Sequence, residues 1–142
     1  MTRYSSWAIR ISLVYLVLGF TLGALMLASK AYVFYPPIFL YLSLHVEYLM
    51  FGWFLHLIFG TAYWMFPRFT PSKTDYEKPR GFVWAAWSSL VVLNLGLVLY
   101  TLGSFLPWSE TLRMVGRVVE TGAVILFLIN LWPRVKPMSE PS

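Results

Sequence analysis

Two histidines, His45 and His56, are the only imidazoles in the chain, and both lie in one long apolar run. At about 100° per residue they share a helical stripe of about 80° with Gly52 and Gly60. Glycine lets a flat ligand approach a helix backbone closely, and ionisable groups at membrane depth usually face the bundle interior or a cofactor. Imidazole nitrogen is a common ligand of haem iron. The stripe therefore predicts a haem site, with His45 on the iron and His56 on a possible second haem iron.

Each histidine also has a simpler interpretation, a buried imidazole that hydrogen-bonds a neighbouring backbone group or hydroxyl. If the run enters the membrane near residue 38, His45 lies about 10 Å along the helix and His56 about 27 Å along it, at a rise of 1.5 Å per residue. The roughly 16 Å between them is too long for both to bind one iron. A second axial ligand must therefore come from elsewhere.

Three ionisable residues, Arg113, Arg117 and Glu120, fall on one face of the last apolar run, at offsets of four and seven residues. If that run enters from the same side, Arg113 and Arg117 lie near the depth of His45. Guanidinium groups bind carboxylates with paired hydrogen bonds, so we expect these two arginines to hold the haem propionates. The alternative is that the arginines extend toward the membrane surface and Arg117 pairs with Glu120.

The composition places these residues in a membrane. Of 142 residues, 58% are hydrophobic and only 12% are charged, which excludes an ordinary soluble domain. Disulfides, iron–sulfur clusters and thiolate metal sites are excluded because the chain has no cysteine. We expect an all-α, integral membrane four-helix bundle that forms a single domain over residues 1–142. The apolar runs predict helices over about 8–29, 38–66, 82–103 and 110–132.

The net charge of +5 does not indicate nucleic-acid binding, because the basic residues flank the apolar runs. By the positive-inside rule both termini and the 67–81 loop are cytoplasmic, and the chain is a multi-pass protein of the inner (cytoplasmic) membrane. The residues on which this orientation rests are Arg3, Arg10, Arg68, Lys73, Lys78, Arg80, Arg134 and Lys136.

Two further features concern helix packing. Gly19 and Gly23 are four residues apart in the first run, a spacing that favours close packing of helices in lipid. Glu47 lies about 160° from the histidine stripe, so we expect it to face another helix or a partner.

The run LHVEYLMFGWFLHLIFGTAYWMFPRF resembles the second helix of the haem-copper oxidase subunit I superfamily, particularly its nitric-oxide-reductase and C-family oxidase branch. The similarity lies in the histidine near the start, in Phe51-Gly52-Trp53, and in the stretch from Gly60 to Pro67. The resemblance implies that His45 ligates a low-spin haem b. The superfamily's catalytic subunit has about twelve helices, a second ligand histidine and a three-histidine metal centre, and this chain lacks the histidines for them.

We therefore expect no complete oxidase or reductase active site in the chain. The favoured interpretation is a membrane b-type cytochrome for electron transfer, or for haem storage, delivery or sensing. One alternative is a non-haem accessory or assembly subunit of an oxidase-like complex. Another is a small transporter that uses Glu47, Arg117 and Glu120.

The missing axial ligand predicts a parallel homodimer, or a higher homo-oligomer, in which His45 of each protomer binds a shared haem iron. The face that carries Gly52 and Gly60 would then be buried between subunits. Methionine is the alternative ligand within one chain, and Met26, Met50 and Met114 are the candidates. The expected partners are membrane lipid, a second copy and a redox partner.

Overall fold

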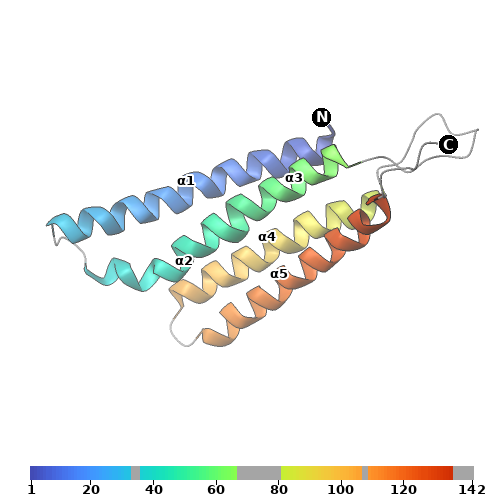
Figure 1. Ribbon diagram of the computed structural model, residues 1–142. Helices are drawn as coiled ribbons and strands as arrows, with labels where there is room; N and C mark the ends of the chain where they lie inside the picture. The colour runs from blue at the N-terminus through green and yellow to red at the C-terminus, as the bar shows by residue number, and fades with distance from the viewer. Residues whose placement is uncertain (33–35, 67–80, 107–108, 136–142) are drawn as a thin grey trace, which may run out of the picture.

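The computed structural model describes residues 1–32, 36–66, 81–106 and 109–135. Within them the chain forms four long helical spans (Figure 1). The first is α1 (Arg3–Tyr32). The second span, Pro36–Met65, runs continuously through η1 (Pro36–Tyr41), α2 (Leu42–Glu47), η2 (Tyr48–Leu55) and α3 (His56–Met65). The last two are α4 (Val83–Phe105) and α5 (Glu110–Leu131), and α5 ends in the short turn η3 (Trp132–Arg134).

All four spans are long and apolar enough to cross a membrane, in agreement with the predicted all-α architecture of a multi-pass protein. The largest difference is at the start, where α1 begins at Arg3 and not near residue 8. The cause is Thr2, whose hydroxyl accepts a hydrogen bond of 3.2 Å from the backbone N–H of Ser5 and so caps the first turn. The basic residues of segment 67–80, and Lys136, lie outside the described residues.

The spans pack as two hairpins. In Figure 1, α1 lies along the second span, and α4 lies along α5 in the most extensive helix pair of the molecule. Gly96 and Gly116 allow this closeness, because a Cβ on either would lie 2.9 Å from the carbonyl oxygen of the other. The bundle thus has a terminal end, where α1 begins and α5 ends, and a hairpin end, where α4 ends and α5 begins (Figure 1).

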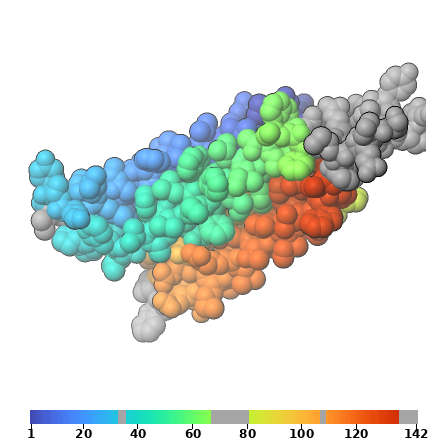
Figure 2. Space-filling view, viewed as in Figure 1, coloured from blue at the N-terminus to red at the C-terminus, as the bar shows by residue number. Residues whose placement is uncertain are grey.

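The two hairpins meet through a core of apolar side chains. Phe59 of α3 stacks on Phe127 of α5 with ring centroids 4.0 Å apart. Figure 2 shows α1, the second span and α5 side by side across one face of the molecule. The buried cluster consists of Tyr4, Ala8, Phe59, Tyr63, Ala86, Leu90, Leu93, Leu97, Ala123 and Phe127.

The surface of the bundle is apolar as well. Large side chains on separate helices are more than half exposed, for example Val17 of α1, Val91 of α4 and Val118 of α5. A water-soluble monomer rarely exposes apolar side chains on every helix, whereas a bundle surrounded by lipid tails is stabilised by them. This surface agrees with four membrane-spanning helices.

Candidate functional site

His45 lies at the seam between α2 and α1, in the half of the bundle near the hairpin end. Its Nδ1 is 2.7 Å from the carbonyl oxygen of Gly19, and its ring lies against Gly23, where a Cβ would be 2.7 Å from Cε1. Because a carbonyl only accepts, Nδ1 carries the proton and donates it. Nε2 then has a free lone pair, and no residue in the described ranges hydrogen-bonds to it. The ring is only partly buried.

His56 is in a different situation. It is fully buried, its Nδ1 donates to the carbonyl oxygen of Phe51 at 3.0 Å, and its Nε2 accepts from the Asn94 side-chain amide at 3.0 Å. The Asn94 carbonyl oxygen in turn accepts from the Tyr15 hydroxyl at 3.2 Å. Both imidazole nitrogens therefore have partners inside the protein. His56 joins α1, the second span and α4 in one polar network, as the simpler interpretation of a buried histidine expects.

The predicted stripe does lie on one face of the second span, and α1 covers that face. His45 contacts Gly19 and Gly23 of α1, and a Cβ at Gly52 would lie 2.6 Å from Cγ of Tyr15. A Cβ at Gly60 would lie 3.0 Å from Cγ1 of Ile9.

The glycine face was expected to lie against haem or a second subunit. Here it is filled by α1, because Gly19 and Gly23 also remove side chains from α1 and let the two backbones approach. Gly52 and Gly60 thus serve packing between the first two spans.

Between the two histidines the helix is not an ordinary α-helix. Residues 48–55 form η2, a π-helical segment, and the His56 side chain bonds the carbonyl oxygen of Phe51, five residues earlier. Segments of this kind are rare and often occur at functional sites. The sequence carries no signal for it, because its residues are common in α-helices as well.

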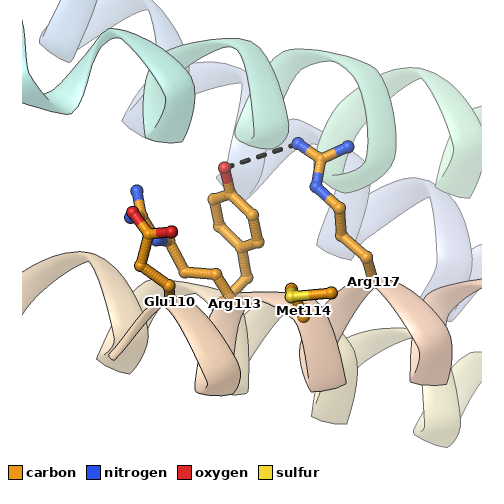
Figure 3. Close-up of a pocket in the computed structure, with 5 residues that line it drawn as sticks. Glu110, Arg113, Met114 and Arg117 are labelled. Atoms are coloured by element: carbon orange, nitrogen blue, oxygen red, sulfur yellow. Dashed lines mark hydrogen bonds and ion pairs between the residues drawn. The ribbon is translucent and has the colours of Figure 1, made fainter. Parts of the chain in front are cut away.

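Glu47 faces α5, on the side of the second span opposite to the histidines. Its Oε2 accepts a 2.7 Å hydrogen bond from Nη2 of Arg117, so the carboxylate partner of Arg117 is Glu47 and not Glu120, the partner in the alternative interpretation. The Tyr100 hydroxyl lies 3.4 Å from the same guanidinium nitrogen (Figure 3). The predicted orientation of Glu47 is therefore confirmed, whereas the alternative i,i+3 pair of Arg117 with Glu120 is replaced by an ion pair between two helices.

A pocket of about 200 Å³ lies beside this ion pair at the hairpin end. Figure 3 shows the side chains of Glu110, Arg113 and Arg117 extending from α5 toward the second span. Arg113 pairs with the exposed Glu110 at 3.0 Å. The full lining is Tyr100, Glu110, Arg113, Met114 and Arg117.

The structure thus separates the residues that were expected to share one haem. His45 is directed toward α1, whereas Arg113 and Arg117 line a pocket on the α5 side of the second span. No protein-family model, curated protein or solved structure matches the chain.

The full burial of two ionisable residues was not predicted from the sequence. Glu120 is fully buried, and neither of its oxygens has a donor within the described residues. Arg134, expected to anchor the chain at the membrane surface, is also fully buried and donates at 2.8 Å to the carbonyl oxygens of Tyr63 and Phe66. A guanidinium with several donors suits the unsatisfied carbonyls at the end of a helix. Arg134 therefore joins the end of α3 to the end of α5.

Proposed function

We propose that the chain is a membrane b-type cytochrome in which His45 binds the haem iron. The observation that supports this is the hydrogen bond from Nδ1 of His45 to the carbonyl oxygen of Gly19, which leaves the Nε2 lone pair free. Histidines that ligate metals almost always donate their other ring N–H to a carbonyl or carboxylate, which fixes the tautomer and the ring orientation. The donor chemistry of His45 therefore fits an axial ligand.

The rest of the expected ligand set fits less well. Binding iron through His56 would break its bonds to Phe51 or Asn94, so we leave it out of the proposed ligands. Gly52 and Gly60 pack against α1, and Gly23 is the glycine that makes room for the ligand imidazole. Bound haem would supply a one-electron couple.

Arg113 and Arg117 do not reach His45 within one chain, because they lie across the second span from it. We therefore assign them to the pocket at the hairpin end and not to propionates of a haem on the same chain.

A second copy of the chain would also supply the second axial ligand. Among the described histidines of one chain, only His45 has a free ring nitrogen, and a low-spin haem b needs two strong ligands. We propose a parallel homodimer in which the two His45 side chains bind the same iron, with both termini cytoplasmic in the inner membrane. The resemblance of the second span to the oxidase superfamily supports the same ligand. A redox partner would exchange electrons at this haem.

A visible absorption spectrum of protein purified after haem-replete expression tests the proposal. We expect a Soret band and a sharp reduced α-band, both lost in His45→Ala and retained in His56→Gln, which keeps a side chain that can hydrogen-bond to Asn94. An empty Soret region in the wild-type protein would reject the cytochrome and favour the non-haem accessory or assembly subunit. Full haem content in His45→Ala would reject the ligand.

A further inference from the structure

Glu120 is a buried carboxyl inside the bundle. The residue is fully buried on α5, and neither carboxyl oxygen accepts a hydrogen bond from any donor in the described residues. Its Cγ lies beside Gly96 of α4, where a Cβ would be 2.6 Å away, so α4 closes over it. Leaving an ionised carboxylate in such a place without a partner is very costly.

The charges around Glu120 do not balance. Arg117, one turn earlier on α5, is the cation that faces it, and Glu47 of α2 is the second carboxyl. The Arg117 guanidinium already bonds Glu47 at 2.7 Å. Tyr100 of α4 and Tyr15 of α1 face the same group of charges with neutral hydroxyls. One guanidinium against two carboxyls leaves one negative charge in excess.

The two carboxyls are also close enough to bond each other. Glu120 lies within hydrogen-bonding reach of Glu47, whose Oε1 is buried and has no donor either. Two ionised carboxylates only accept, so a bond between them requires a proton on one of them. Oε2 of Glu47 already accepts a 2.7 Å hydrogen bond from the Arg117 guanidinium, whereas neither oxygen of Glu120 has a donor among the described residues, so the proton belongs on Glu120.

The pocket at the hairpin end borders the Arg117–Glu47 ion pair. It has a volume of about 200 Å³, and the Arg117 side chain that lines it (Figure 3) also bonds Glu47 at 2.7 Å. A water molecule occupies about 30 Å³ in the liquid, so the pocket has room for several beside its charged lining. Glu120 lies about 4.5 Å further along α5 than Arg117, because three residues rise by that distance.

We propose that Glu120 is a proton-binding site within the membrane span, loaded through this pocket. When loaded, the Glu120 carboxyl donates its proton in a hydrogen bond to Oε1 of Glu47, while Arg117 stays bonded to Oε2. When unloaded, the proton passes to water in the pocket. Glu47 remains charged in both states. The site does not depend on haem binding.

Infrared spectroscopy of the full-length protein in lipid nanodiscs tests the proton itself. The chain has six carboxyl side chains, and we expect one of them to show the C=O stretch of a protonated acid at neutral pH, with a shift in D₂O. The band should be absent in Glu120→Gln and unchanged in Glu110→Gln, where the side chain is exposed. Absence of the band from the wild-type protein would overturn the proposal, whatever the variants do.

The route of the proton through the pocket is tested separately. The measured quantity is the rate at which the C=O band shifts after transfer of the protein to D₂O. Met114 lines the pocket and is largely exposed, so Met114→Trp should fill the pocket without touching Glu120. We expect this variant to exchange at least several-fold more slowly than Val118→Trp, a substitution on the exposed face of the same helix. Equal exchange rates in the two variants would overturn loading through the pocket.

Discussion

Nδ1 of His45 lies 2.7 Å from the carbonyl oxygen of Gly19, a residue on the neighbouring helix and 26 positions earlier in the chain. This bond sets both the tautomer and the direction of the imidazole, because only one ring nitrogen is left with a lone pair. It also makes the geometry of α1 part of the proposed ligand site. Substitutions on α1 should therefore change ligand binding without touching the histidine.

Gly23→Ala is the most direct of these substitutions. The added Cβ would lie 2.7 Å from Cε1 of His45, too close for contact, so the ring must move and its bond to Gly19 must weaken. We expect lower haem content and an overpacking cost of about 1–3 kcal/mol in the free energy of unfolding.

The control for Gly23→Ala is Gly122→Ala on α5, because nothing lies within 4 Å of the added Cβ there. Haem content should be read from absorbance per chain in both variants. A Gly23→Ala variant with wild-type haem content and stability would show that the ring position is not constrained by α1.

The two arginines of α5 should differ sharply in their effect on stability. Arg117→Leu leaves the buried Glu47 carboxylate without its cation and should lower the free energy of unfolding by about 3 kcal/mol. This value is near the low end for a broken buried pair, because Arg117 itself is half exposed. Arg113→Leu removes an exposed pair with Glu110 and should cost less than about 1 kcal/mol. Unfolding of both variants in the same mixed micelles measures the difference, and equal costs would contradict the assigned pairing.

Arg134 should act as a structural link between the ends of α3 and α5. Arg134→Leu removes the donor to the carbonyl oxygens of Tyr63 and Phe66, and each buried carbonyl left unsatisfied costs about 1–3 kcal/mol. Arg134→Lys should recover only part of this loss, because an ammonium lacks the planar fork that reaches two carbonyls together. If unfolding shows Arg134→Leu to be neutral, these hydrogen bonds do not hold the helix ends together.

The sequence predicts faces of helices well, but not what covers them. The prediction that His45, Gly52, His56 and Gly60 share one helical face was correct, and all four lie on the α1 side of the second span. A helical wheel cannot distinguish a cofactor from a neighbouring helix, because both need small residues at the contact. The glycines of α1 were the available signal, since two complementary glycine faces favour packing of the helices against each other.

Long-range pairs were the hardest part to predict. Arg117 has Glu120 at a suitable spacing on its own helix, yet it bonds Glu47, 70 positions away. Spacing within one helix shows which pairs are possible, whereas the packing of the two hairpins decides which pair forms. The same holds for His56 and Asn94, which are 38 positions apart.

The last prediction concerns stoichiometry. If the two His45 side chains of a parallel dimer share one iron, native mass spectrometry should show two chains with one haem, and electron paramagnetic resonance should show bis-histidine ligation. The competing arrangement is a monomer with histidine–methionine ligation. Met26 is its strongest candidate, because it is buried one turn from Gly23, whereas Met50 and Met114 are largely exposed.

Met26→Leu separates the two arrangements, because leucine conserves volume and removes the sulfur. A shared haem predicts that Met26→Leu keeps the haem, its spectrum and the dimer. Dilution of the detergent-solubilised dimer should then release haem as the chains separate, since each chain alone supplies one ligand. A monomer that keeps one haem per chain, and loses low-spin ligation in Met26→Leu, would contradict the dimer.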